Sequence, residues 1–316
     1  MRPARVTGKG AGRQPLLVAG PTGNVEPGAA ASAAGLVPAP VVLVAHGSGD
    51  PRAARTTEAL TRAVAAARPG LLVRASYLDH GPPRPGAVLA ELAAAGHRQV
   101  VLVPLLLTAA YHGRVDIPGA VEAARAAGLR IPVRTAEVLG PTAGGVDPLL
   151  LAGLRRRLAE AVGAAALDGG SVPAPAVGGG SVPGPAVDGG GRVPGLAGGI
   201  DGVVLAAAGT RDAAARETVV RAAEALGAAT GLPTRVGYAS AAPPTAGTAV
   251  RALREAGARR VAVATYFLAP GRLCESALAS AREAGAVALA APLGDAPELA
   301  RLVLARVDAV LAGDTP

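Results

Sequence analysis

A pattern that occurs twice is the strongest constraint on the fold of this 316-residue chain. Three stretches of the first half return in the same order in the second half: 41–50 as 203–212, 74–83 as 235–244, and 100–112 as 261–273. The first pair reads VVLVAHGSGD against VVLAAAGTRD. We therefore expect two domains built on one scaffold, and the length of the chain suits two domains.

Short apolar segments alternate with amphipathic ones in both halves. The segments typical of buried strands are 41–45, 71–78, 99–104 and 131–134, then 203–207, 234–238 and 261–267 in the second half. The segments with helical spacing are 52–68, 87–95, 117–127 and 149–162, then 213–229, 248–256, 275–284 and 297–311. Such alternation indicates a parallel sheet with helices on both faces. The predicted fold is therefore α/β, with two tandem domains of this kind.

The composition changes outside these two regions. Residues 1–39 are rich in Gly, Pro and Ala without periodicity, which predicts a disordered N-terminal extension. Residues 163–200 contain near-repeats such as GGSVPAPAV and GGSVPGPAV. This tract has too little apolar surface to fold, which predicts a linker, with a docking site for a partner as the alternative. The two domains are then expected at 40–162 and 201–313.

The composition also excludes several classes of function. The net charge of +8 suggests nucleic acid, but Lys9 is the only lysine and aromatic residues make up 2%, so we expect no nucleic-acid partner. The longest apolar run, 100–111, is too short to cross a bilayer and contains Pro104, so we expect no membrane span. A single cysteine excludes an internal disulfide framework, and we expect no secretory signal, which favours the cytoplasm.

The two copies differ in their polar residues. Three polar residues of the first half face less polar ones in the second: His46 aligns with Ala208, Asp79 with Ser240, and His112 with Leu273. His46, Asp79 and His112 each follow a different predicted strand, and ligands bind where the carboxyl ends of parallel strands meet. Two imidazoles and a carboxylate suit Fe, Co, Ni or Zn, and neutral imidazole also accepts protons near neutral pH. The sequence therefore predicts a metal or proton-transfer site in the first half.

Other polar residues near these strands have simpler explanations. His80 is an alternative third ligand, although its side chain would point away from the site if the strand continued through it. His97 is expected at the surface as a helix cap, and Cys274 in the packing of the second half. Arg114 and Asp116 have the spacing of a local ion pair at the start of a helix.

Three motifs resemble a known family. They are HGS after the first strand, an acidic residue after the second, and PLLLTAAYHGRVDIP at 104–118. Together they resemble the class II chelatases, which insert a divalent metal into sirohydrochlorin in siroheme and cobalamin synthesis. The long members of that family are duplicated, with the active histidines in one half. The resemblance implies two His and a Glu at the metal-binding cleft, corresponding here to His46, His112 and Asp79, so that Asp replaces Glu.

The resemblance implies a lyase, a sirohydrochlorin chelatase. His46 and His112 would be the catalytic residues, and with Asp79 they would bind the metal, which is a substrate rather than a permanently bound cofactor. Fe²⁺ is favoured over Co²⁺ because the chain has no His-rich metal-storage tract. The tetrapyrrole carries many carboxylates, so Arg114, Arg52 and Ser48 are expected to bind it.

Three alternative functions are weighed against the chelatase. A non-catalytic protein that carries a metal or tetrapyrrole would use the same polar residues. A cobaltochelatase of cobalamin synthesis would differ only in its metal. A nucleotide-binding protein would need a Gly-rich phosphate loop, and HGSGDP at 46–51 has neither the G-x-G-x-x-G spacing nor a P-loop lysine. The second half is expected to form the opposite wall of the cleft or only to stabilise the first half.

Overall fold

Two parallel β-sheets form the framework of the protein. The computed structural model describes residues 38–108, 115–168 and 199–313. The predicted N-terminal extension and most of the predicted linker lie outside these residues. Within the described part, no helix has both the length and the apolar character that a membrane crossing requires.

The first sheet has the strand order β2-β1-β3-β4, all parallel. Its strands are β1 (Val41–Ala45), β2 (Val73–Tyr77), β3 (Val100–Pro104) and β4 (Val133–Thr135). All five residues of the central strand β1 are buried, because helices cover the sheet on both faces. A run of apolar residues without alternation is typical of such a strand.

The second sheet repeats this order as β6-β5-β7-β8. Its strands are β5 (Gly202–Ala207), β6 (Thr234–Tyr238), β7 (Val261–Tyr266) and β8 (Ala288–Leu289). The central strand β5 is again buried along its whole length. The register is also repeated: Val41 lies opposite Val73 and Val101 in the first sheet, and Val203 lies opposite Thr234 and Ala262 in the second. The predicted fold of two tandem parallel-sheet domains is confirmed.

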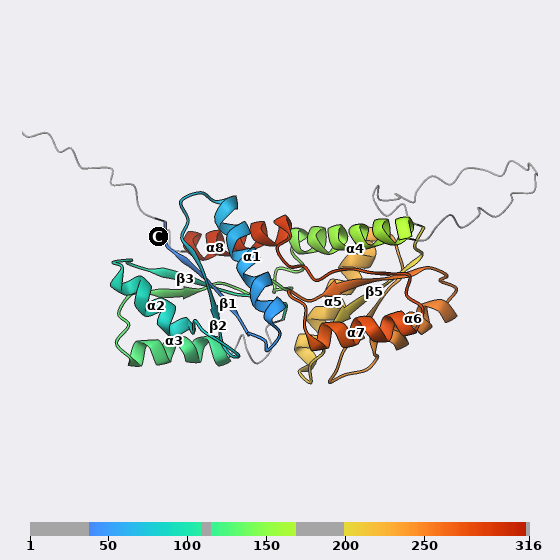
Figure 1. The fold of residues 1–316 in the computed structure, drawn as a ribbon, viewed down its shortest axis with the longest axis horizontal. Coiled ribbons are helices and arrows are strands. Elements are labelled where there is room, and N and C mark those ends of the chain that lie inside the picture. The colour runs from blue at the N-terminus through green and yellow to red at the C-terminus, as the bar shows by residue number, and fades with distance from the viewer. Residues whose placement is uncertain (1–37, 109–114, 169–198, 314–316) are drawn as a thin grey trace, which may run out of the picture. The chain divides into compact units, whose positions relative to one another are not determined.

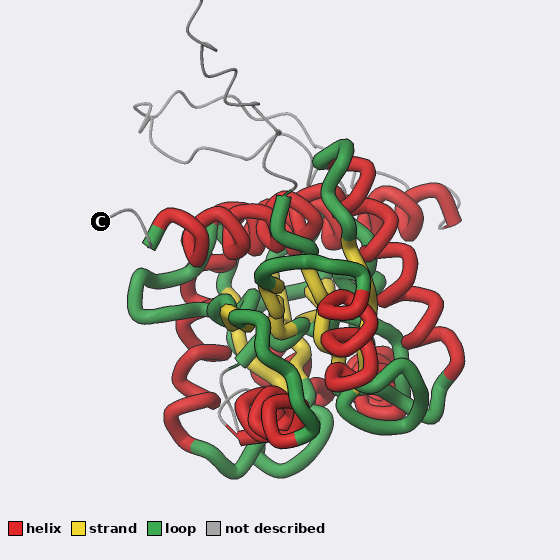
Figure 2. Tube along the Cα trace, turned by 90° about the vertical axis from the view of Figure 1, so that its left-hand side faces the viewer, coloured by secondary structure: helices red, strands yellow, loops and turns green. Residues whose placement is uncertain are grey.

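The helices lie around the strands (Figure 2). In the first half they are α1 (Pro51–Ala67), α2 (Pro85–Ala94), α3 (Ile117–Ala126) and α4 (Pro148–Asp168). In the second half they are α5 (Ala213–Thr230), α6 (Ala246–Glu255), α7 (Arg272–Glu283) and α8 (Pro297–Ala312). Residues of β1 alternate between two apolar cores, with Val41 and Leu43 in one and Val42 and Val44 in the other. The second of these cores also contains residues of α2 and α3.

The last helix of each half packs on the other half. The contacts of α4 are with β7, β8, α5 and α8, whereas α8 contacts α1 and β3 (Figure 1). Three leucines on one face of α4, Leu150, Leu154 and Leu158, are almost completely buried in a core that also includes residues of β1 and β5. The two halves are therefore joined by one continuous apolar core as well as by the chain itself.

Polar contacts reinforce this exchange of helices. Arg156 of α4 donates from Nε to both carboxylate oxygens of Glu298 in α8, at 2.9 Å each. The Glu298 side chain is only 8% exposed, so its charge needs this partner. Arg68, just after α1, makes two 2.7 Å hydrogen bonds to Asp308 of α8.

The two-residue strand β8 was not predicted. The bounds of the predicted strands and helices agree with the structure to within a few residues, with one larger difference. Helix α4 continues to Asp168, past the predicted end at Val162. The prediction started the linker at Gly163, but one glycine costs a helix only about 1 kcal/mol relative to alanine. The three alanines that follow have the highest helix propensity of any residue, so the helix continues through the glycine.

Candidate functional site

The loops after the central strands adopt the same conformation in both halves. Gly47 follows β1 with φ of 95°, and its counterpart Gly209 follows β5 with φ of 88°. A Cβ atom on Gly47 would lie 2.1 Å from the carbonyl oxygen of Asp79, and one on Gly209 would lie 1.9 Å from that of Ser240. Both positions need glycine, because the φ is positive and another backbone passes very close.

The backbone brings two of the predicted site residues together. The N–H of Asp79 donates to the carbonyl of His46 at 2.8 Å, so the ends of β1 and β2 are held side by side. The equivalent bond in the second half joins Ser240 to Ala208 at 3.1 Å. The two halves therefore share one backbone arrangement and differ in the side chains that it carries.

A cavity of about 1100 Å³ lies between the two halves at these loops. The first half lines it with residues 45–50, 79–82 and 105–108, and the second half with 207–210 and 266–274. Its size matches that of a large ligand pocket. The expectation that the second half supplies an opposite wall agrees with this lining, and the shared core shows that it stabilises the first half as well.

His46, Asp79 and His80 form the polar group on the first-half wall. The rings of His46 and His80 meet edge to face, with their centroids 6.2 Å apart. Nε2 of His80 lies 3.8 Å from Oδ2 of Asp79. The sequence prediction placed the His80 side chain away from the site on the condition that the strand continued. Strand β2 ends at Tyr77 and His80 has φ of 61°, which turns its ring into the cavity.

Asp79 carries a negative charge at neutral pH. The backbone N–H of His80 donates to Oδ1 of Asp79 at 2.8 Å. This hydrogen bond, followed by the charges of His80 and Arg84, holds the pKa of the Asp79 carboxyl below its usual value. With 60% of the side chain exposed, Asp79 is accessible to a ligand. It can therefore attract a cation or orient an imidazole, but it is not suited to donate a proton.

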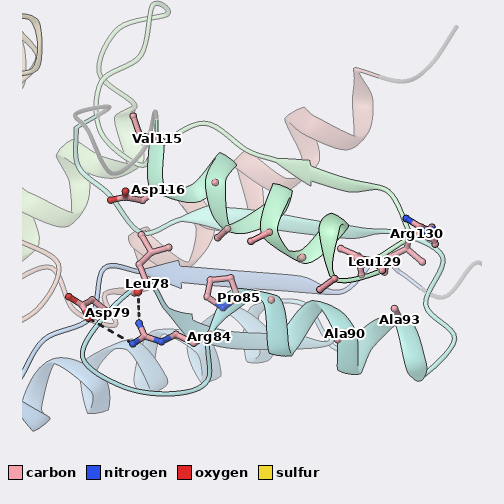
Figure 3. Close-up of a pocket in the computed structure, with 18 of the residues that line it drawn as sticks. Leu78, Asp79, Arg84, Pro85, Ala90, Ala93, Val115, Asp116, Leu129 and Arg130 are labelled. Atoms are coloured by element: carbon pink, nitrogen blue, oxygen red, sulfur yellow. Dashed lines mark hydrogen bonds and ion pairs between the residues drawn. The ribbon is translucent and has the colours of Figure 1, made fainter.

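A second hollow, of about 1200 Å³, lies between α2 and α3 and adjoins the same polar group. Arg84 points to Asp79 and the Leu78 carbonyl at one end of it, and Arg130 lies at the other end (Figure 3). Alanine and glycine residues line most of the length in between. His46 and Asp79 border both hollows, so they stand where the two spaces meet.

Ser48 and Arg52, the predicted substrate-binding residues near α1, have different surroundings. Ser48 lines the cavity, and its Oγ accepts from the N–H of Asp50 at 3.1 Å. Arg52 donates to Asp50 and to Glu275 of α7. The hydrogen bond from Arg52 lowers the pKa of Asp50 to about 2. The Arg52 guanidinium is therefore engaged by two carboxylates and is not among the residues that line the cavity, so the structure gives no support to its predicted role as a carboxylate-binding residue.

The remaining predicted site residues, His112 and Arg114, lie outside the described residues. The ion pair considered for Arg114 and Asp116 therefore lies outside them as well. Asp116 directly precedes α3 at its N-cap position and borders the hollow between α2 and α3. Among the residues that the structure describes, no group of three His, Cys, Asp or Glu side chains is arranged to hold a metal ion. Of the three predicted metal ligands, the structure therefore describes only His46 and Asp79. His80, which the sequence argument placed away from the site, lines the same cavity.

The second-half wall is mainly apolar. Tyr266 at the end of β7 donates its hydroxyl to the Leu107 carbonyl of the first half at 3.0 Å. Cys274 is 3% exposed, as expected of a packing residue, and burial raises its pKa to about 11. Arg272 and Leu273 complete this wall at the start of α7. The sequence comparison identified Leu273 as the counterpart of a histidine but gave no reason to select Arg272.

Comparisons with known proteins agree with this architecture. The CbiX family model matches residues 40–161 and 202–310. The structure of SirB from Bacillus subtilis with Fe³⁺ has a TM-score of 0.66 at 18% identity, over 86% of this chain and 95% of that one. The sirohydrochlorin chelatase SirB from Bacillus subtilis subspecies spizizenii, in complex with cobalt, has a TM-score of 0.62 at 17% identity, over 87% and 95%.

A third structure is described as CbiX, the terminal enzyme for biosynthesis of siroheme in denitrifying bacteria. It has a TM-score of 0.56 at 24% identity, over 85% of this chain and 98% of that one. At these identities the three structures establish the fold alone. A comparison with curated protein sequences finds no match. The family model matches once in each half and covers well over half of the residues, so the chain belongs to the CbiX family, in a duplicated form.

Proposed function

We propose that this protein inserts a divalent metal into sirohydrochlorin, with Fe²⁺ as the first candidate metal and siroheme as the product. The proposal rests on the family, on the fold shared with sirohydrochlorin chelatases, and on one observation in particular. The same backbone arrangement presents His46 and Asp79 in the first half but Ala208 and Ser240 in the second. Polar groups concentrated in one copy, on a shared cavity, are typical of a reaction site rather than of folding.

Metal insertion makes two chemical demands on such a site. The free-base tetrapyrrole must lose two pyrrole protons, and the metal must exchange its water for ring nitrogens. A neutral imidazole can accept a proton near pH 7 and is also a ligand for borderline divalent metals. We assign these tasks to His46 and, from the family resemblance, to His112. Asp79 attracts the cation or orients an imidazole through its negative charge.

The ligands at this site do not by themselves select one divalent metal. Nitrogen and carboxylate ligands accept both Fe²⁺ and Co²⁺, so the metal available in the cell decides between them. One of the solved relatives is described with Fe³⁺ and another with cobalt. Insertion of Co²⁺ in cobalamin synthesis is therefore the second candidate reaction at this site.

Substrate recognition requires donors for the peripheral carboxylates of the tetrapyrrole. Ser48 lines the cavity and keeps its hydroxyl hydrogen for a ligand, because its Oγ acts as the acceptor toward Asp50. Arg114 is assigned to the same task from the sequence. Arg52 can take part only by releasing Asp50 or Glu275, so we assign it a smaller role.

Turnover distinguishes this enzyme from a protein that merely carries a tetrapyrrole or a metal. Purified protein is mixed with a large excess of sirohydrochlorin and Fe²⁺ or Co²⁺ without oxygen, and the visible spectrum is followed. A chelatase converts many equivalents of substrate per protein, at a rate proportional to the protein concentration. A spectral change that stops at one equivalent would contradict the proposal and favour the carrier.

A further inference from the structure

The wall contributed by the second half has two unusual side chains at the start of α7. Leu273 is 46% exposed, which makes it the most exposed of the large apolar residues in the described part of the chain. Arg272 directly precedes it, and both residues line the cavity opposite His46 and Asp79. This surface offers an apolar contact next to a positive charge.

The charge of Arg272 has no protein partner among the described residues. Its natural partner along the helix is Glu275, three positions further on. Glu275 instead pairs with Arg52 of the first half. A cation in the first turn of a helix is also disfavoured by the helix dipole, so Arg272 gains nothing from its position in α7. Within the described part of the chain, the pairing of Glu275 with Arg52 thus leaves Arg272 without a carboxylate partner at the start of α7.

We propose that Arg272 binds a peripheral carboxylate of the tetrapyrrole, and that Leu273 contacts the face of the macrocycle. This inference rests on the proposed function. It gives the second half, which lacks the polar residues of the first, a role in binding the substrate. A tetrapyrrole is a flat apolar ring bordered by carboxylates, which matches an exposed leucine beside a guanidinium that pairs with no described residue. The guanidinium can bind a carboxylate through two parallel hydrogen bonds. Arg272 is then a substrate-binding residue and takes no part in proton transfer.

The effect of losing this contact follows from the strength of charged hydrogen bonds. A hydrogen bond to a charged group changes affinity on the order of tenfold to a hundredfold. Because Arg272 is exposed and screened by solvent, we expect the lower end of this range. The loss should appear in the dissociation constant and in KM, with kcat almost unchanged, because the contact exists before and during metal insertion.

The test compares Arg272→Gln with Arg282→Gln in the full-length protein. Arg282 lies in the last turn of the same helix, is exposed and does not line the cavity, so it controls for the loss of one positive charge. Binding of metal-free sirohydrochlorin is measured by absorbance titration at low and high salt. We expect Arg272→Gln to weaken binding about tenfold at low salt, and Arg282→Gln to leave it within twofold. Leu273→Asp should also weaken binding.

The outcomes separate this inference from the proposed function. Wild-type turnover combined with normal substrate binding by Arg272→Gln would overturn the role of Arg272 and leave the chelatase assignment standing. Equal losses in Arg272→Gln and Arg282→Gln would also overturn it, since they would indicate a general charge effect. Failure of the wild-type protein to bind sirohydrochlorin would contradict both proposals.

Discussion

The backbone contact at Gly47 allows a sharp test of how the first-half site is positioned. In Gly47→Ala the new Cβ would lie 2.1 Å from the Asp79 carbonyl oxygen, whereas real Cβ atoms keep at least 3.0 Å. Asp79, which follows β2, must therefore move away from residue 47 by roughly 1 Å. The positive φ adds a strain of about 1–3 kcal/mol to the folded state. A misplacement of about 1 Å in a catalytic group costs about 100-fold in rate.

Gly209→Ala is the matched control, because its Cβ would overlap the Ser240 carbonyl oxygen at 1.9 Å with nearly the same φ. Both variants should lose similar stability in urea unfolding. Only Gly47→Ala should lose about 100-fold in kcat for metal insertion, whereas Gly209→Ala should change mainly KM. Equal losses of kcat in two variants of equal stability would refute the claim that the geometry of the first-half loops matters specifically.

Three further predictions concern stability and reactivity. Leu154→Ala should lower the free energy of unfolding by about 2–5 kcal/mol, because this side chain lies in the core that both halves share. Urea should still unfold the variant in a single transition. Two separate transitions would contradict the claim that the halves share one core. Arg156 lowers the pKa of Glu298. The stability lost in Arg156→Ala should therefore be constant above about pH 5 and shrink below about pH 4, as Glu298 takes up a proton. A loss of stability that does not depend on pH would exclude this pairing. Burial raises the pKa of Cys274 to about 11. The thiol of the native protein should therefore react with iodoacetamide at about pH 8 far more slowly than the thiol of the unfolded protein. Equal rates would show that the native thiol is accessible.

The fold was predictable because its main signals are local. The apolar segments at Val41–Ala45 and Val100–Pro104 are short and buried on both sides, which only a covered parallel sheet provides. The repetition of these segments predicts the second sheet without further information. The family resemblance predicted from the sequence is confirmed on the same basis, because the CbiX model matches each copy.

The exchange of α4 and α8 was not predictable from the same signals. The spacing of Leu150, Leu154 and Leu158 shows that one face of α4 is apolar, but the pattern is the same whichever sheet covers it. A long connection between the halves permits either arrangement. The choice depends on packing between distant segments, which one sequence does not reveal.

The candidate site was predictable in part. Residues that directly follow parallel strands must share one sheet edge, and this rule brought His46 and Asp79 together. The alternation of side chains along a strand was the wrong guide for His80, because β2 ends at Tyr77 and a left-handed turn redirects the His80 side chain. The pairing of Arg52 with Glu275 was not predictable, because the two residues are far apart in the sequence.

The central claim is that metal insertion depends on the polar group of the first half. The most direct test is the kcat for metal insertion into sirohydrochlorin by His46→Ala, with His97→Ala as the control, since His97 does not line the cavity. Our account predicts a loss of at least about 100-fold for His46→Ala with its stability unchanged, and near-normal kcat for His97→Ala. A kcat for His46→Ala within a few-fold of the wild type would contradict the account.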